Sequence, residues 1–419
     1  MSTQRQVSER AVVFLIGAVQ FVNILDFVMV MPLGPDFARG LGIAASHIGT
    51  IGGVYTAAAS VAGLAGGYFL DRFDRRTALA VSMLGLVVAT AAGGLATGLS
   101  TLLVARVLAG IFGGPATSLA FSIIADLVSV ERRGRAVGAV MVSFSIAAVA
   151  GVPMALKLAE YGGWRTPFFV VAGLGLLVAA GAIFYLPPVR GHLQSGHQQA
   201  HAVGMLELLG RRDVQLSYVL TVVVMVASFV IVPNISAYLQ QNLSYPRETL
   251  WLPYFLGGIV SLATLRMAGP MVDRHGAFAV GLVGSVLVLV STYVGFVDYP
   301  RWLPVPVLVM LFMMATGARN VAYNTLTSRV PDSPVRVRFM SLQSAIQHIA
   351  SAAGAFLGAQ LLTDLPDGTL GGVGRIAVVA FGCTLLVPPL LWEVERRVLA
   401  RERAQALAAS SSWHGAHGG

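Results

Sequence analysis

A short charged loop between two long apolar runs decides how this chain folds. It reads Gly67-Tyr-Phe-Leu-Asp71-Arg72-Phe-Asp74-Arg75-Arg76-Thr-Ala-Leu79. The apolar runs at 47–70 and 77–97 each reach the roughly 20 residues that a helix needs to cross a bilayer. Because arginine and aspartate are unfavourable in hydrocarbon, we expect the loop at a membrane surface between two spanning helices.

The composition extends this interpretation to the whole chain. Of 419 residues, 56% are hydrophobic and only 11% are charged, which leaves too few polar residues to cover a water-soluble protein of this size. The single cysteine, Cys383, excludes an internal disulfide and an Fe–S or cysteine-based zinc site. The net charge of +9 does not indicate nucleic-acid binding, because the basic residues sit between apolar runs and form no solvated patch.

Twelve apolar runs predict an all-α membrane protein. The predicted spans are 11–33, 47–70, 77–97, 101–125, 136–158, 165–188, 214–240, 250–272, 278–298, 303–327, 339–363 and 371–392. They divide six and six around a polar linker, which predicts a first bundle at 1–188, a linker at 189–213, a second bundle at 214–393 and a tail at 394–419. We expect two pseudo-symmetric six-helix bundles.

Most of the basic residues lie in alternate loops, which predicts that both termini and the 189–213 linker are cytoplasmic. The tail is expected to form an amphipathic helix at the inner surface, followed by a disordered end. Lys157 is the only lysine beside 27 arginines, which suggests a GC-rich bacterial gene. We therefore expect a multi-pass protein of a bacterial inner membrane, acting as a monomer.

The two halves repeat one another. Asp71-Arg72 recurs as Asp273-Arg274, and Asp26-Phe27-Val28 occupies the register of Ser228-Phe229-Val230. An internal repeat of six spans is typical of secondary transporters, whose substrate site lies near the membrane midplane between the halves.

Charges inside the predicted spans are the strongest functional signal, because an ionisable residue in hydrocarbon is costly. Asp26, Arg106, Arg266 and Arg319 are in this position. At about 1.5 Å per helical residue, Asp26 and Arg106 both lie roughly 8 Å below the outer face, so they can pair. Burial favours the neutral acid and a nearby guanidinium favours the carboxylate, so the protonation of Asp26 can switch. The alternative is a static structural pair.

The 67–79 loop resembles the signature loop of the major facilitator superfamily, G-x-L-a-D-R-x-G-R-[RK]-x-x-L, from which only Phe69 and Asp74 depart. The resemblance implies a cytoplasmic gate in which Asp71 caps a neighbouring helix and arginines pair across the seam between the bundles. A shortened copy begins at Gly269 in the second half. The expected gate residues are Gly67, Asp71, Arg72, Arg75, Arg76, Gly269, Asp273 and Arg274. The alternative is that the arginines only set topology.

Further elements are similar to the twelve-span drug:proton antiporters and sugar efflux proteins of that superfamily. These are Leu25-Asp26 followed by Pro35, Leu102-x3-Arg106-x3-Gly110, Gly163-Trp164-Arg165-x-Pro-Phe168, and Gly151-Val152-Pro153 as a weakened form of the antiporter G-P pair. The resemblance implies that spans 1, 4, 7 and 10 line a central cavity. We expect Asp26 and Arg106 to couple protons, and the substrate cavity to include Asn23, Asp26, Tyr55, Ser228, Arg319, Asn320, Asn324, Gln343, Gln347 and His348. For the neutral polar residues, helix-joining hydrogen bonds are an equally good explanation.

The predicted function is export of a small organic molecule by a rocker-switch carrier driven by the proton gradient, without another cofactor or a metal. Drug-like lipophilic or cationic compounds rank first, sugars or metabolites second and amphipathic lipids third. A passive facilitator or an importing symporter of the same fold is the alternative. An enzyme is disfavoured, because the spans hold one acid and the chain has no H-E-x-x-H motif.

Overall fold

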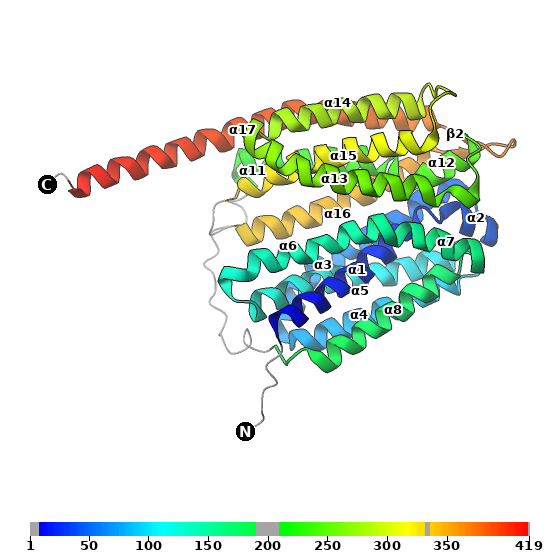
Figure 1. Ribbon diagram of the computed structural model, residues 1–419, viewed down its shortest axis with the longest axis horizontal. Helices are drawn as coiled ribbons and strands as arrows, with labels where there is room; N and C mark the ends of the chain where they lie inside the picture. The colour runs from blue at the N-terminus through cyan, green and yellow to red at the C-terminus, as the bar shows by residue number, and fades with distance from the viewer. Residues whose placement is uncertain (1–7, 190–208, 332–335, 418–419) are drawn as a thin grey trace.

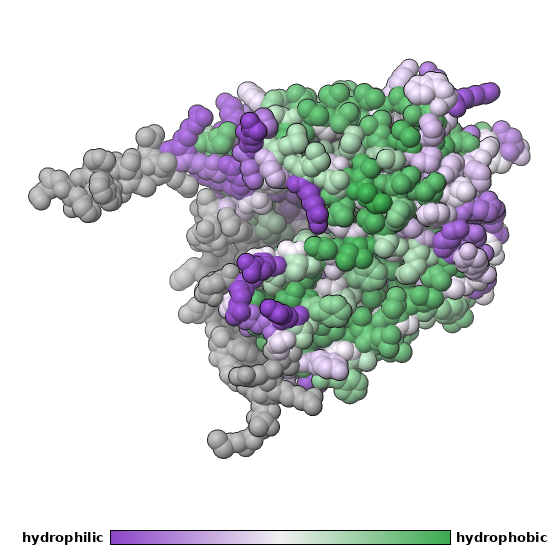
Figure 2. All heavy atoms as spheres, in the orientation of Figure 1, coloured by the Kyte–Doolittle hydropathy of each residue, from purple (hydrophilic) through white to green (hydrophobic). Residues whose placement is uncertain are grey.

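The computed structural model describes residues 8–189, 209–331 and 336–417, which are almost entirely helical. Hydrophobic side chains cover the middle of the visible face, and hydrophilic ones gather toward its two ends (Figure 2). Phe14, Leu177 and Phe184 are 80%, 71% and 75% exposed. An apolar belt of this kind is unfavourable in water and suits contact with lipid tails. The chain is a multi-pass membrane protein.

The long helices run side by side, so the molecule has two distinct ends (Figure 1). We call the end where the first helix begins and the last helix finishes the basic end. The opposite end, which carries the small β1–β2 hairpin (Thr363–Asp364 and Leu370–Gly371), is called the hairpin end.

The N-terminal bundle packs six spanning segments. Its elements are α1 (Glu9–Val30), α2 (Gly34–Leu41), η1 (Ala45–His47), α3 (Ile48–Phe69), η2 (Leu70–Arg72), α4 (Arg75–Gly94), α5 (Leu99–Leu127), α6 (Val130–Ile146), η3 (Ala147–Gly151), α7 (Val152–Gly162) and α8 (Thr166–Tyr185). Helix α1 lies against α5, α6 and α8, and α5 lies against α3 and α4.

The C-terminal bundle repeats this arrangement. Its elements are α11 (Arg212–Phe229), η4 (Val232–Asn234), α12 (Ile235–Gln241), η5 (Arg247–Thr249), α13 (Trp251–His275), α14 (Ala277–Phe296), α15 (Val305–Arg329), α16 (Arg336–Leu361), β1, β2 and α17 (Val373–His417). Most of the predicted 189–213 linker lies outside the described residues, so the predicted domain limits stay predictions.

Eleven helical segments among the described residues are long and apolar enough to cross a membrane. The one predicted span that is not among these eleven, 339–363, corresponds to α16, which is 26 residues long and lies against both α3 and α11. It has the length of a span, and its lower hydropathy reflects polar residues such as Gln343, Gln347 and His348. The predicted all-α fold is confirmed, although the predicted ends of several spans need correction.

The predicted first and seventh spans, 11–33 and 214–240, implied two continuous α-helices, but the structure shows a break in each. Helix α1 ends at Val30, just before Pro32, and α11 ends at Phe229, shortly before Pro233. Proline lacks a backbone N–H and crowds the preceding turn, so the helix breaks at equivalent places in the two halves.

The last helix is also longer than predicted. A single helix, α17, runs through both the predicted last span, 371–392, and most of the predicted tail, 394–419. The tail begins inside the bundle, because Arg401 donates to Asp213 at 3.0 Å and to the Val330 carbonyl at 2.7 Å, and Arg329 pairs with Glu402 at 2.7 Å. These contacts hold the first turns of the tail against α11 and α15.

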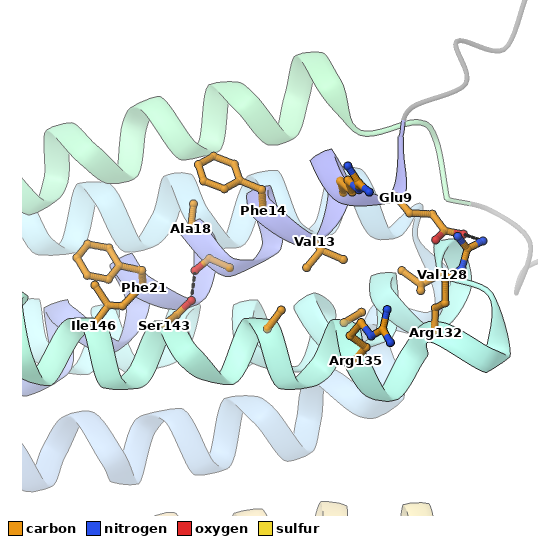
Figure 3. A pocket seen from close by; sticks show the side chains of 14 residues that line it. Glu9, Val13, Phe14, Ala18, Phe21, Val128, Arg132, Arg135, Ser143 and Ile146 are labelled. Atoms are coloured by element: carbon orange, nitrogen blue, oxygen red, sulfur yellow. Dashed lines mark hydrogen bonds and ion pairs between the residues drawn. The ribbon is translucent and has the colours of Figure 1, made fainter. Parts of the chain in front are cut away.

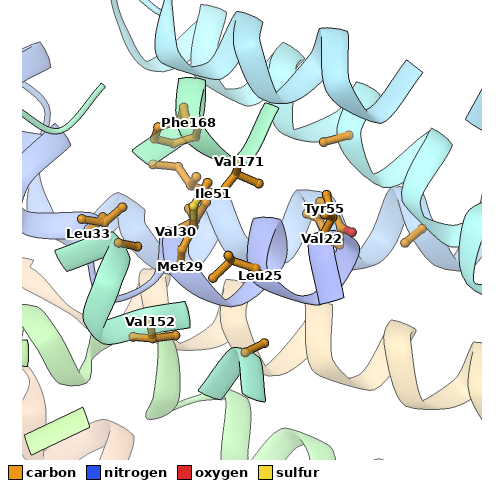
Figure 4. Close-up of a cluster of buried hydrophobic side chains, with 14 of the residues drawn as sticks. Val22, Leu25, Met29, Val30, Leu33, Ile51, Tyr55, Val152, Phe168 and Val171 are labelled. Atoms are coloured by element: carbon orange, nitrogen blue, oxygen red, sulfur yellow. The ribbon is translucent and has the colours of Figure 1, made fainter. Parts of the chain in front are cut away.

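The two bundles share a core at the hairpin end. One buried cluster includes Leu33 and Phe37 from the first half together with Ile231 and Tyr238 from the second, whereas a separate cluster is confined to the C-terminal bundle. Figure 4 shows the part of the shared cluster around α1, where Leu25 and Met29 lie among side chains from neighbouring helices.

Glycines allow the bundles to approach closely. A Cβ at Gly49 on α3 would lie 2.5 Å from the carbonyl oxygen of Ala355 on α16. A Cβ at Gly258 on α13 would lie 2.8 Å from the Cα of Val149 in η3. Both distances are too short for any other residue without movement, so these two glycines define the seams between the bundles.

Candidate functional site

The centre of the N-terminal bundle holds a buried ion pair. Asp26 on α1 is 0% exposed, and Arg106 on α5 is 1% exposed. One guanidinium nitrogen of Arg106 lies 3.1 and 3.0 Å from the two carboxylate oxygens of Asp26, and the other lies 3.3 Å from its carbonyl oxygen. The depth estimate from the sequence placed these residues at one level, and the structure joins them. Their role in proton coupling stays a prediction.

Thr90 on α4, which was not predicted from the sequence as a site residue, also contacts Asp26. Its hydroxyl oxygen lies 2.8 Å from Oδ1 of Asp26 and 2.8 Å from the carbonyl oxygen of Leu86. A hydroxyl has one proton to donate, so Thr90 can donate to Asp26 or to its own helix. A threonine in an apolar helix gave no signal in the sequence, because such residues commonly bond back to the preceding turn.

Tyr55 on α3 and Asn23 on α1 form a second polar layer beside the ion pair. The guanidinium carbon of Arg106 lies 4.6 Å from the centre of the Tyr55 ring, a cation–π contact. The Tyr55 hydroxyl donates to Asn23 at 2.9 Å, and the Asn23 amide donates to Thr117 at 2.7 Å. A Cβ at Gly113 would lie 2.5 Å from the Tyr55 hydroxyl, so a glycine there makes room for this network.

An aromatic stack links this network to the other bundle. The rings of Phe27 and Tyr55 lie 5.1 Å apart, and those of Phe27 and Phe229 lie 6.4 Å apart. Phe27 and Phe229 occupy the same register of the internal repeat. Neither was predicted as a cavity residue, although this equivalence was the available signal. The stack places apolar, flat surface where the two bundles meet.

The C-terminal bundle contains a buried arginine in place of an ion pair. Arg319 on α15 is 0% exposed, and it donates to Ser228 on α11 at 2.7 Å and lies 3.5 Å from the Thr384 hydroxyl on α17. Within the described parts of the chain, Arg319 forms no salt bridge, and its Nε has no hydrogen-bond partner. A buried cation without a carboxylate is unfavourable unless polar groups or a ligand compensate for its desolvation.

The remaining predicted cavity residues divide between the bundle interior and its surface. Gln343 is buried and donates to Thr221 at 2.5 Å inside the C-terminal bundle. Asn324 is exposed and donates to the Asn320 carbonyl at 2.8 Å, and His348 bonds to its own helix at Ser344. These hydrogen bonds lie within one helix or join two helices, which agrees with the alternative that the polar residues serve helix packing. The described contact of Gln347 involves its backbone carbonyl oxygen, which accepts a hydrogen bond from the Ser351 hydroxyl.

The basic loop after α3 contacts its own bundle. Arg75 pairs with Asp126 on α5 at 2.7 Å, and Arg76 donates to the Ile183 carbonyl on α8. Asp74, the residue that departs from the family pattern, caps α4 by accepting from the Arg76 amide at 3.0 Å. These described contacts lie within the bundle and not across the seam. Arg72 is exposed, and the side chain of Asp71 lies outside the described residues, as does the Gly67 environment.

The second copy of the loop is capped from another helix. Glu395 on α17 accepts from the amides of Ala277 and Phe278 at 2.6 and 3.1 Å, so its carboxylate lies at the N-terminus of α14. Asp273 and Arg274 are exposed. Helix capping by a neighbouring carboxylate was predicted for this motif, but the structure assigns it to Glu395 in this half. Gly269 would meet no atom within 4 Å of an added Cβ, so it makes no close helix contact.

The Gly151-Val152-Pro153 element forms a bulge at the seam. Residues Ala147–Gly151 make a π-helical turn, after which Pro153 occupies the first turn of α7. Proline cannot donate to the residue four positions earlier, Val149, which favours such a local widening. Val149 packs on Gly258 of α13, and a Cβ at Gly151 would lie 2.7 Å from Leu25, next to Asp26. The bulge therefore connects the seam to the ion pair.

A polar lock joins the bundles at the hairpin end. Arg247 in η5 pairs with Asp36 of α2 at 2.6 Å and donates to the Leu156 carbonyl at 3.1 Å. Asp364 in β1 accepts from the amides of Ala45 and Ser46 at 3.0 and 3.2 Å. The Asp36 and Asp364 contacts both cross from one bundle to the other. No local sequence pattern predicts this lock, because the partners lie 211 and 319 residues apart.

Comparison with known proteins agrees with this architecture. A model of the Major Facilitator Superfamily matches residues 16–355. A chloramphenicol resistance protein of Streptomyces lividans is 25% identical over 363 residues, which cover 84% of this chain and 90% of that protein.

Two solved structures show the same fold. A D-xylose–proton symporter matches with a TM-score of 0.72 at 17% identity, covering 92% of this chain and 97% of that one. A bacterial homologue of the human lysosomal transporter Spinster, in an inward-facing and unoccupied conformation, matches with a TM-score of 0.71 at 14% identity, covering 94% and 97%. At these identities the likeness concerns the fold alone.

Proposed function

Because this chain belongs to the Major Facilitator Superfamily, it is a membrane transporter of small molecules and not an enzyme, and we propose that it exports drug-like organic compounds in exchange for protons. The family predicted from the 67–79 loop is thereby confirmed. The proposal covers the direction of transport, the coupling ion and the substrate class. It also places the protein in a bacterial inner membrane, with its basic end facing the cytoplasm.

The buried acid carries the proposal. Among the described residues of the N-terminal bundle core, Asp26 is the one carboxylate that is fully buried, and it lies on the helix that also presents Phe27 to the other bundle. A carboxylate paired with a guanidinium can release its proton, and the same group closed off from water can hold one. Asp26 therefore couples the proton to the position of α1.

Thr90 supports both protonation states of this acid. When Asp26 is a carboxylate, the Thr90 hydroxyl donates to it across the 2.8 Å contact. When Asp26 is protonated, its own hydroxyl donates to Thr90, and the Thr90 proton turns to the Leu86 carbonyl. In both states the hydroxyl donors of the Asp26–Thr90 pair have acceptors, which favours reversible protonation in an apolar site.

The aromatic stack favours flat, lipophilic substrates. Phe27 and Phe229 offer ring surface at the meeting point of the bundles, with Tyr55 buried behind Phe27, and aromatic rings bind other rings and cations on their faces. The chloramphenicol resistance protein matches most of this chain, so chloramphenicol is the first compound to test.

A second substrate class follows from Arg319. Its buried guanidinium has polar partners but no described carboxylate, and an anionic or strongly polar metabolite would supply the missing acceptor. Sugars or related metabolites therefore rank after drug-like compounds, and amphipathic lipids rank third.

We assign the structure to the state closed at the hairpin end. Asp36 and Arg247 join the bundles there, and the described ion pairs of Arg75, Arg132 and Arg329 at the basic end each stay within one bundle. A rocker-switch cycle requires the lock to open when the outside is exposed. The lock then stabilises one of the two states and not the other.

Arg247→Gln is expected to shift the population toward the state that is open at the hairpin end. Asp36 and Arg247 are only 11% and 17% exposed, and hydrogen bonds to charged groups contribute about 1.5–3 kcal/mol each, so the population ratio should change at least about tenfold. Spin-label distances between α2 and α12 would report the change. Arg301→Gln, which alters an exposed arginine at the same end, is the matched control. Unchanged distances in the Arg247 variant would mean that the lock does not set the equilibrium.

The proposed function itself is tested in proteoliposomes that contain the purified protein and a pH-sensitive dye. With chloramphenicol on one side and an imposed pH gradient, antiport predicts that drug and protons move in opposite directions. Movement in the same direction would identify a symporter. Drug movement that ignores the gradient would identify a passive facilitator, and no movement of chloramphenicol combined with movement of a polar metabolite would favour the second substrate class.

A further inference from the structure

A groove lies between α1 and α6 at the basic end, away from the ion pair and the aromatic stack. The groove has a volume of about 760 Å³, and Val13, Phe21, Ala139 and Ile146 line it along its length. In Figure 3, Ser143 on α6 points toward α1, whereas Phe14 and Ala18 on α1 point away from α6. The Ser143 hydroxyl donates to the Gly17 carbonyl at 2.8 Å and ties the two helices together at the base of the groove.

Small residues are the reason that the groove exists. Gly17 and Ala18 on α1 and Ala136 and Ala139 on α6 are among the residues that line the groove, so no large side chain fills it at these four positions. The groove borders the lipid-facing belt, because Phe14 and Ile146 at its walls are 80% and 50% exposed. An open apolar groove at this depth will be filled by an acyl chain and not by water.

The mouth of the groove is positively charged. Among the described side chains, Arg10, Arg132 and Arg135 line it together with one acid, Glu9. Glu9 pairs with Arg132 at 3.1 Å, whereas Arg10 and Arg135 are exposed and form no ion pair within the described parts of the chain. Two such guanidinium groups therefore lie at the level where a lipid headgroup meets water. Arginine binds phosphate oxygens strongly because its planar fork matches their geometry.

From this combination we propose that the α1–α6 groove is a binding site for an anionic phospholipid of the adjacent leaflet. One acyl chain lies along Val13, Phe21 and Ile146, and the phosphate is held by Arg10 and Arg135. The site is separate from the transport pathway and does not depend on the exported substrate. It does place a lipid against α1, the helix that carries Asp26, and against α6, which leads into the seam at η3.

The test is a titration of the delipidated protein in detergent with short-chain phosphatidylglycerol, with thermal stability as the readout. Phosphatidylcholine of equal chain length controls for the acyl chain, and glycerol phosphate controls for the headgroup alone. Phosphatidylglycerol is expected to stabilise the protein at the lowest concentration. Glycerol phosphate is expected to have little effect on thermal stability. A ligand that binds more tightly stabilises a protein more, and this headgroup lacks the acyl chain that supplies much of the affinity.

Variants of the mouth and the wall separate the two parts of the site. Arg10→Gln and Arg135→Gln should each weaken phosphatidylglycerol binding roughly fivefold, which is the attraction that one arginine at a membrane surface contributes to binding an anionic lipid. Neither variant should change phosphatidylcholine binding. Ala139→Phe fills the groove and should weaken both lipids. Arg274→Gln, which removes an exposed arginine from the same end of the other bundle, is the matched control and should weaken neither.

Three results would overturn the proposal. Equal stabilisation by the two phospholipids would show that the arginines do not select a headgroup. Full binding in the Ala139 variant would place the lipid elsewhere. A dimer that dissociates in the Ala139 variant, seen by native mass spectrometry, would assign the groove to a second copy of the chain. Each variant is first checked for a thermal midpoint like that of the unaltered protein without lipid. Where a Gln variant fails this check, Arg10→Lys or Arg135→Lys takes its place and tests the forked geometry of the guanidinium in place of the charge.

Discussion

Replacing Asp26 with asparagine is expected to abolish uphill export completely while substrate exchange continues. The asparagine side chain has nearly the shape of a protonated aspartic acid but cannot release a proton, so the exchange of protons for substrate loses its carrier. The bundles can still rock, because asparagine reproduces the protonated state of Asp26, in which Arg106 also keeps its charge and its contact with the residue 26 carbonyl oxygen. The introduced amide would also retain a donor and an acceptor for Thr90.

The measurement is substrate accumulation in proteoliposomes with and without an imposed pH gradient. Gradient-driven accumulation should fall to the level of protein-free liposomes, while equilibrium exchange of labelled for unlabelled substrate remains. Asp298→Asn is the matched control, because it makes the same change at an exposed position between α14 and α15. Normal gradient-driven accumulation by the Asp26 variant would leave His348 as the next protonatable candidate, or no proton coupling at all.

Replacing Arg106 with alanine is expected to uncouple transport from protons as well. Removing one partner from a buried ion pair costs about 3–5 kcal/mol if the other keeps its charge. Asp26 is fully buried, and water cannot replace the guanidinium easily, so the variant avoids this penalty by keeping Asp26 protonated. The variant should therefore behave as Asp26→Asn does, and the double variant should be no worse than either single one.

Infrared difference spectroscopy can check the reason as well as the result. The carbonyl stretch of a protonated carboxylic acid should be present in the Arg106→Ala protein and absent when Asp26→Asn is added. Arg106→Lys keeps the charge but not the forked geometry of the guanidinium, so partial coupling is expected there. Additive losses in the double variant would show that the two residues act separately and would refute a coupled pair.

The sequence was sufficient to predict the fold, because membrane spans can be recognised from the hydrophobicity of a single stretch of about 20 residues. The apolar runs around the 67–79 loop predicted α3 and α4 to within a few residues, and the six-plus-six repeat followed from register alone. The errors lie at helix ends, where Pro32 and Pro233 break the first and seventh spans and where α17 continues past residue 393. Local hydropathy does not record these interruptions, because a proline or a short polar turn changes the average very little.

The candidate site was predictable only in part. Asp26 and Arg106 stood out because charge in an apolar span is rare, and their depths could be counted along the helices. Thr90, Phe27 and Phe229 resemble ordinary residues of a membrane helix, and their importance depends on which residues they touch. The arginines of the 67–79 loop were predicted to bridge the bundles, whereas the contacts described for Arg75 and Arg76 lie within one.

The sequence by itself determined that this chain spans a membrane in two repeated halves and that one acid lies inside the first, because both are properties of residue type and spacing. Only the tertiary structure decided what surrounds that acid, which end of the molecule is locked by Asp36 and Arg247, and where α1 and α6 leave a groove. These features join residues tens to hundreds of positions apart, and their geometry arises from how whole helices pack. No local pattern in the chain specifies a distance between helices, so packing had to be seen before those contacts could be named.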